Sequence, residues 1–165
     1  MNIRIRRARS RDIDPVLAIE EEQFSHPWKK KFFTSELTHN ISFFYVAEDT
    51  DSSEVAGYII FWIIEETLEL HDIAVNGTYK KRGIGAQLMR FMFETAEARG
   101  VEEMFLEVRK SNREAISFYE KFDFKLIGER KDYYADPVED ALIYKLIILA
   151  TGVTRNEETA KKEGR

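Results

Sequence analysis

The segment between residues 73 and 100 constrains the fold more than any other part of this sequence. Ile73-Ala74-Val75 is typical of the end of an apolar strand, and the basic run Lys81-Arg82-Gly83-Ile84-Gly85-Ala86 follows it. The next side chains that share one helical face are Leu88, Phe91, Met92, Thr95 and Ala96. Gly100 then stands where a C-terminal cap is expected. A strand, a glycine loop and an amphipathic helix in this order predict an α/β fold in which the loop opens the helix.

The glycine loop has two interpretations. Glycines let backbone N–H groups turn toward one point, and a helix N-terminus adds partial positive charge, so the loop can hold a phosphate group. A flexible strand-to-helix turn is the alternative, because Gly83-x-Gly85 is typical of both. No Gly-Lys-Ser/Thr follows and the third glycine of the dinucleotide fingerprint is missing, which disfavours the NTPase and dehydrogenase classes.

Hydrophobic periodicity along the rest of the chain predicts the order β-α-α-β-β-β-α-β-α-β-β. The expected strands cover residues 3–6, 43–48, 55–65, 67–75, 104–108, 125–133 and 140–149. The expected helices lie after residue 12, over 30–38, around the face from Leu88 to Ala96 that ends before Gly100, and after a Ser-x-x-Glu capping box at 111–114. Helices between strands predict a sheet covered on both faces, and the hairpins make that sheet mixed.

Composition predicts one domain in a reducing compartment. A chain of 165 residues, 44% of them hydrophobic, can form a single core, which we expect over residues 1–150. Residues 151–165 are polar and are expected to form a frayed tail. The absence of cysteine from the sequence excludes disulfides, thiolate metal sites and a cysteine nucleophile. The N-terminus resembles neither a signal nor a transit peptide, and the longest apolar run, 141–150, is too short to cross a bilayer. A cytoplasmic location without a membrane partner is predicted.

Charge argues against nucleic acid as a partner. The net charge is −5 and most basic residues are scattered, whereas a duplex-binding surface usually carries a basic excess. A small phosphorylated ligand stays open as an alternative.

Two stretches together resemble one family. The run from Ile73 to Ala86 resembles the Arg/Gln-x-x-Gly-x-Gly/Ala pyrophosphate loop of the GNAT acetyltransferases, with Lys81 where Gln or Arg usually begins the pattern. Leu106-Glu107-Val108-Arg109-Lys110-Ser111-Asn112, followed by Ala115-Ile116 and Phe118-Tyr119, is similar to the matching stretch of RimI-type ribosomal-protein and archaeal N-terminal acetyltransferases. With weaker matches near both ends, the resemblance covers residues 3–148. Asp123 in place of a usual Gly and Arg130-Lys131-Asp132 are departures, and we expect neither to touch the acetyl-transfer residues.

The resemblance implies a fold and an activity. The fold would be the GNAT fold, a central, mostly antiparallel, twisted sheet with helices on both faces. The activity would be transfer of acetyl from acetyl-CoA to the α-amino group of a protein N-terminus, with a ribosomal protein as one candidate acceptor, by direct attack in a ternary complex. Acetyl-CoA would be the co-substrate, no metal is expected, and the protein would be a monomer or weak dimer. Two alternatives stay open: a small-amine (polyamine-type) acetyltransferase, and a non-catalytic acyl-CoA-binding regulatory module.

The resemblance also assigns the catalytic residues. An α-amino group has a pKa of about 8 and must lose a proton before it attacks, so a base is required. Glu107, in an otherwise apolar strand, takes the base position and is expected to act through a water; an edge carboxylate facing solvent is its alternative. Tyr119 takes the position of the acid that protonates the leaving thiolate. A core aromatic is the alternative, since Ala115 and Phe122 share its helical spacing.

The remaining site residues fall into two groups. The cofactor-binding group contains Ile73, Ala74, Val75, Lys81, Arg82, Gly83, Ile84, Gly85, Ala86, Asn112 and Tyr119. The substrate-binding group contains Phe24, Trp28, Glu69, His71, Tyr133 and Tyr134, several of which have a core or structural role as their alternative. His26 and His39 lack partners at metal-ligand spacing in the sequence.

Overall fold

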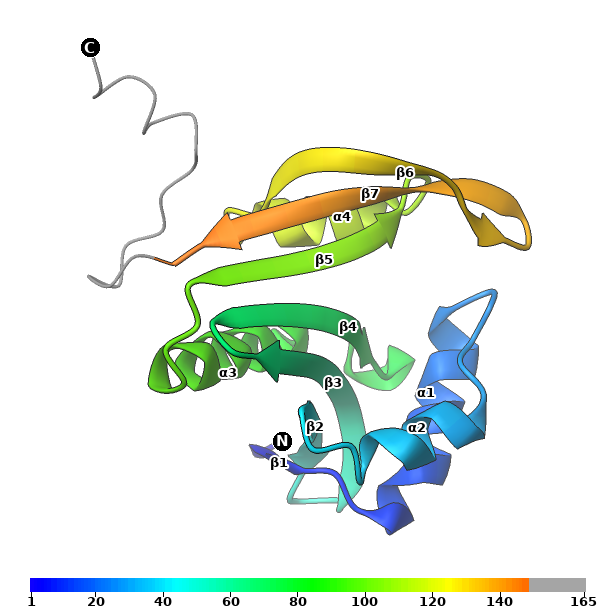
Figure 1. Cartoon of the computed structure of the whole chain (residues 1–165). Helices are drawn as coiled ribbons and strands as arrows, with labels where there is room; N and C mark the ends of the chain where they lie inside the picture. The colour runs from blue at the N-terminus through cyan, green and yellow to red at the C-terminus, as the bar shows by residue number, and fades with distance from the viewer. Residues whose placement is uncertain (149–165) are drawn as a thin grey trace. The chain divides into compact units, whose positions relative to one another are not determined.

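The computed structural model describes residues 1–148, and its element order is the predicted one (Figure 1). The strands are β1 (Ile3–Arg7), β2 (Ser42–Asp49), β3 (Glu54–Ile64), β4 (Thr67–Val75), β5 (Glu103–Arg109), β6 (Lys125–Ala135) and β7 (Val138–Ile147). The helices are α1 (Ile13–Gln23), α2 (Lys30–Glu36), α3 (Ile84–Ala98) and α4 (Arg113–Glu120), with 3₁₀ turns η1 (Ser10–Asp12) and η2 (Gly77–Tyr79). The turns are additions to the predicted order. The expected tail at 151–165 lies outside the described residues.

The sheet is mixed and mostly antiparallel, as predicted. Its strand order is β1-β2-β3-β4-β5-β7-β6. β1 with β2, β2 with β3, β5 with β7 and β6 with β7 are antiparallel, whereas β4 pairs with β5 in parallel from Thr67↔Glu103 to Leu70↔Leu106. The parallel pair follows from the crossover through α3, because two parallel neighbours need a long connection.

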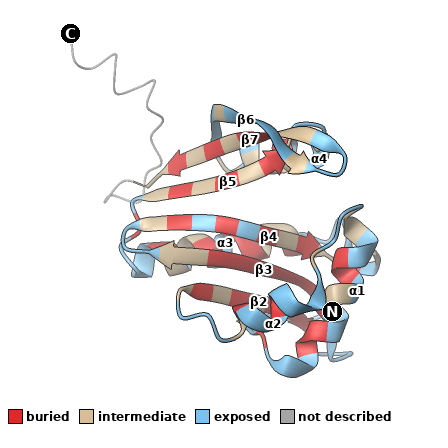
Figure 2. Ribbon diagram, turned by 45° about the vertical axis from the view of Figure 1, so that its right-hand side comes forward, coloured by how far each residue is buried: buried red, intermediate tan, exposed pale blue. Residues whose placement is uncertain are grey.

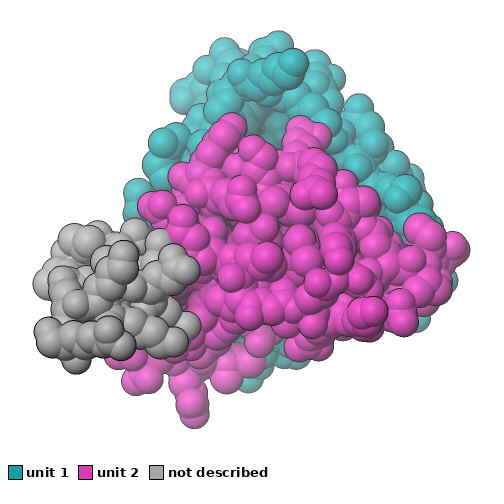
Figure 3. Space-filling view, turned by 90° about the horizontal axis from the view of Figure 1, so that it is seen from above, with its two compact units in different colours: residues 1–63, 71–98 teal, residues 64–70, 99–165 magenta. Residues whose placement is uncertain are grey.

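The chain divides into two compact units, coloured teal and magenta in Figure 3. Unit 1 contains residues 1–63 and 71–98; the described part of unit 2 contains residues 64–70 and 99–148. The prediction of one GNAT domain over residues 1–150 stays a prediction.

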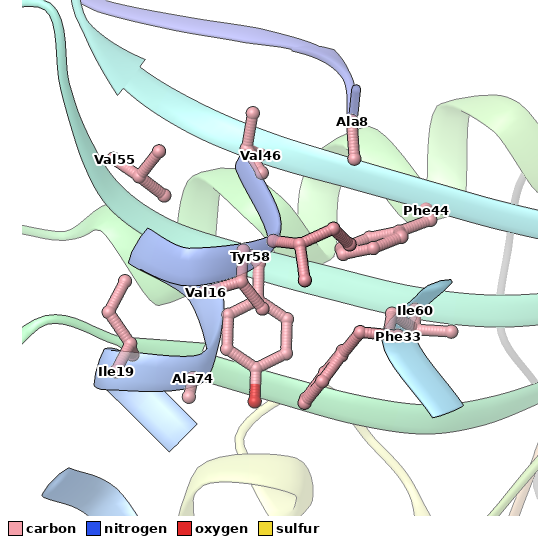
Figure 4. Packing of buried hydrophobic residues seen from close by; sticks show 11 residues of the cluster. Ala8, Val16, Ile19, Phe33, Phe44, Val46, Val55, Tyr58, Ile60 and Ala74 are labelled. Atoms are coloured by element: carbon pink, nitrogen blue, oxygen red, sulfur yellow. The ribbon is translucent and has the colours of Figure 1, made fainter. Parts of the chain in front are cut away.

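Unit 1 has helices on both faces of its strands. Phe44 and Val46 of β2 join Tyr58 of β3 in a cluster with residues of α1 and α2 (Figure 4). Tyr45 points the other way, and its ring lies 4.5 Å from that of Phe91 in α3. Because successive strand side chains alternate in direction, α3 covers the opposite face. Residues 55–61 of β3 are accordingly buried on both faces (Figure 2).

In unit 2, strand alternation gives β5 one buried and one accessible face. Met104, Leu106 and Val108 are buried, whereas Glu107 and Arg109 between and beyond them are half-buried. Leu106 pairs with Tyr144 of β7, whose hydroxyl lies 3.1 Å from a carboxylate oxygen of Glu120 in α4. The buried face therefore packs toward α4. Glu107 lies on the other face, the one from which a side chain can reach solvent.

Candidate active site

The glycine loop opens α3 in unit 1. Gly83 has a φ of +78°, a conformation that favours glycine, and a Cβ there would meet nothing within 4 Å. The N–H of Gln87 donates to the carbonyl of Gly83 at 3.0 Å, so the helical bonds begin there. The first N–H groups of a helix have no partner inside it, so those after Gly83 can point toward an anion. Exposed Lys81 and Arg82 precede them and add positive charge.

The chain before this loop is anchored by side-chain hydrogen bonds. The hydroxyl of Tyr79 donates to Glu54 at 2.8 Å, and the ring lies 5.6 Å from the guanidinium of Arg82. Asn76 caps η2 by accepting a hydrogen bond from Thr78 N–H at 2.9 Å. The N–H of Gly77 donates to Glu22 of α1 at 3.0 Å. These contacts tie the approach to Gly83 to β3 and α1 of unit 1.

β4 carries the expected Ile73–Val75 segment, and β3 approaches it closely. A Cβ on Gly57 would lie 2.8 Å from the carbonyl oxygen of Ala74. Only a glycine therefore fits at this position without displacing the strand. The N–H of Asn76 donates to the carbonyl of Ala56 at 2.9 Å, which continues the contact between the two strands.

Glu107 in unit 2 has a cationic neighbour. Its side chain is 27% exposed, and its Oε1 lies 3.2 Å from Nε of Arg130 in β6. Arg130 was expected not to touch the acetyl-transfer residues, and that prediction is wrong. Both Arg130 and Arg109 pair with Ala141 of β7, so their side chains share its face, which is also the face of Glu107. The small Ala141 lets Arg130 reach across it.

The tyrosine pair lies in the same charged neighbourhood of unit 2. The rings of Tyr133 and Tyr134 are 5.1 Å apart and nearly perpendicular, and the guanidinium of Arg109 lies 4.0 Å from the Tyr134 ring. Partial desolvation and then the charge of Glu107 raise the pKa of Tyr133, and Glu69 adds to the effect. Burial raises the pKa of Tyr134 to about 12, although Arg109 opposes it. Glu69, Glu107 and the two tyrosines therefore interact electrostatically.

α4 carries the other two expected residues of unit 2. The helix begins at Arg113, and Asn112 caps it by accepting a hydrogen bond from Ala115 N–H at 3.1 Å. The capping box expected from Ser111 is therefore wrong by one residue, because Ser111 N–H donates to Glu139 at 2.6 Å instead. Tyr119 is half-buried, with its ring 6.2 Å from that of Phe124. Both residues thus have a structural contact beside their expected roles.

Phe24 and Trp28 pack partly against the core of unit 1. The Trp28 ring lies 5.6 Å from that of Phe33, and its backbone N–H donates to Glu20 at 2.7 Å. His71 lies elsewhere in unit 1, with its ring 4.3 Å from that of Trp62. Each of these side chains thus has packing contacts within unit 1. These contacts agree with the structural role that was the alternative to substrate binding for several of these residues.

The expected residues fall into both units. Unit 1 holds Phe24, Trp28, His71, Ile73–Val75 and the glycine loop, and unit 2 holds Glu69, Glu107, Asn112, Tyr119, Tyr133 and Tyr134. Sequence reasoning missed the contact of Arg130 with Glu107, because nothing local in the sequence marks a partner on another strand. It also missed that Glu20 and Asp72 are buried carboxyls. The sequence did indicate their burial, because each lies at a position where the periodicity of its helix or strand places apolar side chains.

Two further properties concern the described part of the chain. Among residues 1–148, no group of three or more His, Cys, Asp or Glu side chains is arranged to hold a metal ion. No helix within the same residues has the length and apolar character needed to cross a membrane.

Comparisons with known proteins identify the family. Residues 13–124 match the model of the acetyltransferase (GNAT) family. An N-alpha-acetyltransferase of Sulfurisphaera tokodaii is 35% identical over 153 residues, 85% of this chain and 90% of that protein. The crystal structure of the ribosomal-protein-S18-alanine N-acetyltransferase from Escherichia coli superposes with a TM-score of 0.80 at 30% identity, covering 89% of this chain and 94% of that one. Arabidopsis thaliana NAA60 in complex with acetyl-CoA shares the fold, with a TM-score of 0.79 at 18% identity over 89% of this chain and 99% of that one. The chain therefore belongs to the acetyltransferase (GNAT) family.

Proposed function

We propose that this chain transfers the acetyl group of acetyl-CoA to the α-amino group of a protein N-terminus, with a ribosomal protein as one candidate acceptor. The observation that carries the proposal is the open, left-handed Gly83 turn that begins α3 behind two basic side chains. Family membership and the names of two relatives, which acetylate α-amino groups or a ribosomal protein alanine, support it.

Acetyl-CoA is the proposed co-substrate. The N–H groups of residues 83–86, with Lys81 and Arg82, would hold its pyrophosphate, since a helix N-terminus favours negative charge. The backbone of Ile73–Val75 would line the pantetheine arm and stabilise the developing oxyanion. Asn112 and Tyr119 would complete the cofactor contacts. The NAA60 structure with acetyl-CoA supports this choice of ligand for the fold.

Glu107 and Tyr119 are the proposed acid–base residues. Glu107, half-buried yet reached by water, takes a proton from the α-ammonium group through a water molecule. The amine nitrogen then forms a bond to the thioester carbonyl carbon. The bond formation leaves the negative charge on the carbonyl oxygen of a tetrahedral intermediate. When this intermediate collapses, the carbon–sulfur bond breaks, the sulfur takes a proton from the Tyr119 hydroxyl, and the nitrogen loses its second proton to water. Solvent then reprotonates Tyr119. Arg130 competes with the cationic acceptor for Glu107 before the reaction begins.

A peptide acceptor is favoured over a small amine by the aromatic pair near Glu107. Tyr133 is 50% exposed and can pack against a peptide backbone. Phe24, Trp28, Glu69, His71 and Tyr134 stay proposed acceptor residues. The monomer or weak dimer, the cytoplasmic location and the absence of nucleic-acid and membrane partners stay predictions.

The test of the cofactor site uses two matched glycines. Gly83 and Gly100 have φ values of +78° and +71°, and a Cβ would meet nothing within 4 Å at either. Gly83→Asp and Gly100→Asp therefore introduce the same backbone strain and the same charge. We expect only Gly83→Asp to weaken acetyl-CoA binding in calorimetric titration, by about tenfold or more, the equivalent of roughly 1.4 kcal/mol. Equal affinity of the two folded variants would move the cofactor away from this loop.

The acceptor class is tested with a panel of peptides and polyamines and labelled acetyl-CoA. We expect a peptide with a free N-terminus to give the highest kcat/KM, and the same peptide with a blocked N-terminus to give no product. Polyamines that exceed every peptide in kcat/KM would assign the chain to the small-amine class instead. Binding of acetyl-CoA without transfer to any acceptor would favour the non-catalytic module.

A further inference from the structure

Three side chains of unit 1 form a buried polar cluster that the proposed mechanism does not use. Glu20 of α1 is 2% exposed and Asp72 of β4 is 9% exposed. Tyr58 of β3, whose hydroxyl oxygen is visible in Figure 4, is fully buried. The Tyr58 hydroxyl contacts Oε2 of Glu20 and lies 2.9 Å from Oδ2 of Asp72. We call Glu20 and Asp72 the carboxyl pair.

Counting protons shows what this geometry requires. A tyrosine hydroxyl has one proton to donate, and here it faces two carboxyl groups. If both carboxyls were ionised, one of them would face the oxygen lone pairs of Tyr58 with no hydrogen from that hydroxyl to accept. One additional proton removes the conflict, because a neutral carboxyl can donate to the tyrosine oxygen while the tyrosine donates to the other carboxylate.

The surroundings favour that additional proton. Burial, and then the charge of Glu20, raise the pKa of Asp72 well above its usual value, while hydrogen bonds from Tyr58 and from Ile73 N–H oppose the rise. Burial also raises the pKa of Glu20, against hydrogen bonds from Tyr58, Trp28 N–H and Asp72. The groups that act on the pair are thus neutral donors and the partner carboxyl. A second negative charge would be costly in such a site.

The pair connects two segments with proposed roles in the reaction. Glu20 accepts a hydrogen bond from the N–H of Trp28 at 2.7 Å, and Trp28 is a proposed acceptor contact. Asp72 directly precedes Ile73, whose N–H it accepts, and Ile73 begins the proposed cofactor segment. Tyr58 joins these contacts through the middle of β3. A change in the charge of the pair therefore acts on both segments at once.

We propose that the carboxyl pair holds one shared proton at neutral pH. We further propose that this protonated cluster positions Trp28, in the connection between α1 and α2, for acceptor binding. The positioning half of this inference rests on the proposed function; the proton does not. Glu20, Tyr58 and Asp72 are positioning residues that act through the backbone of Trp28 and Ile73. Loss of the proton at alkaline pH places two negative charges side by side in the core. Their repulsion can move the Glu20 side chain away from Asp72, and this movement breaks the hydrogen bond that Glu20 accepts from Trp28 N–H.

The proton is tested without any activity measurement. Infrared spectra at pH 7 should show the C=O stretch of one neutral carboxylic acid in the wild type, and Asp72→Asn should lack it, because a single remaining carboxylate needs no additional proton. Glu22→Gln is the matched control: it lies on the same helix, is exposed, and should retain the signal. Glu20→Gln repeats the test if Asp72→Asn does not fold. A wild type without the signal, or a signal that persists in both variants, overturns the proposal.

The positioning role is tested by the split between KM and kcat. Above the pH at which the infrared signal disappears, the wild-type KM for the acceptor peptide should rise, by up to tenfold per pH unit for one proton, with kcat changed little. In Asp72→Asn the KM should stay level over the same range. A wild-type KM that stays level while the signal disappears overturns the positioning role. If no acceptor is acetylated by any variant, the proposed function fails, while the infrared result still decides the shared proton.

Discussion

Two carboxyl environments in this chain differ in what surrounds them. Glu107 on β5 is 27% exposed and lies 3.2 Å from the guanidinium of Arg130. Glu20 and Asp72 are 2% and 9% exposed, and a tyrosine hydroxyl lies between them. Glu107 thus has solvent and a cation beside it, whereas burial beside a second acid favours a carboxyl that keeps a proton in the pair. In the proposed function, the same chemical group would therefore serve for proton transfer in one region and for positioning in the other.

The largest expected effect comes from removing the charge of Glu107. Glu107→Gln keeps the shape of the side chain but cannot take a proton, so kcat/KM for the acceptor should fall by roughly 10²–10⁴-fold. The free energy of unfolding should change by less than about 1 kcal/mol, because an exposed ion pair adds little stability. Steady-state kinetics with the acceptor peptide and thermal unfolding measure the two effects.

The matched control for this comparison is Glu20→Gln at neutral pH. It also neutralises one carboxyl, but in the pair that already holds one proton, so kcat should stay within a fewfold of the wild-type value. Equal losses of kcat in Glu107→Gln and Glu20→Gln would mean that the two regions do not have separate roles.

The next effect concerns stability and its pH dependence. The folded protein keeps a proton on the carboxyl pair that the unfolded chain releases at pH values near about 4. The folded state then binds more protons, so the free energy of unfolding should fall by about 1.4 kcal/mol per pH unit above that value, until the raised folded-state pKa is reached. Asp72→Asn should lack this slope. Denaturant unfolding of both proteins between pH 5 and pH 9 measures the difference, and parallel curves would contradict the assignment.

Much of the fold was predictable because its signals are local. The apolar stripe and the glycine after it predicted α3, and the structure confirms this helix. It ends at Ala98, and Gly100 has a φ of +71°. The short apolar run from Met104 to Val108 predicted the strand that the structure has as β5. The capping box at Ser111 failed because Glu139, distant in sequence, takes the Ser111 N–H. Local patterns therefore predict that a helix forms, but a contact with a residue distant in sequence decides whether Ser111 or Asn112 caps it.

The candidate site was predictable only through the resemblance to a family. Glu107 and Tyr119 carry no local signal that separates catalysis from packing, so their roles stay predictions. Arg130 was misjudged because its contact with Glu107 depends on the β5-β7-β6 order and on Ala141 between them. The apolar phases of Glu20 and Asp72 indicated that each is buried, but their pairing could not be predicted, since α1 and β4 meet only in the folded chain.

The smallest expected effect comes from Arg130, and it tests what the cation beside Glu107 does to acceptor binding. Its side chain is 55% exposed, so Arg130→Gln should change the free energy of unfolding by no more than about 1 kcal/mol. The variant removes a cation that competes with the α-ammonium group of the acceptor. The acceptor KM should therefore fall a fewfold at low ionic strength, and the difference from wild type should shrink as salt screens exposed charges. Exposed Lys131, the next residue, gives the control Lys131→Gln, for which no such salt-dependent difference is expected. A higher KM in Arg130→Gln would mean that Arg130 contacts the acceptor directly. The region around Glu107 would then differ from the buried carboxyl pair by an acceptor-binding cation as well as by its access to water.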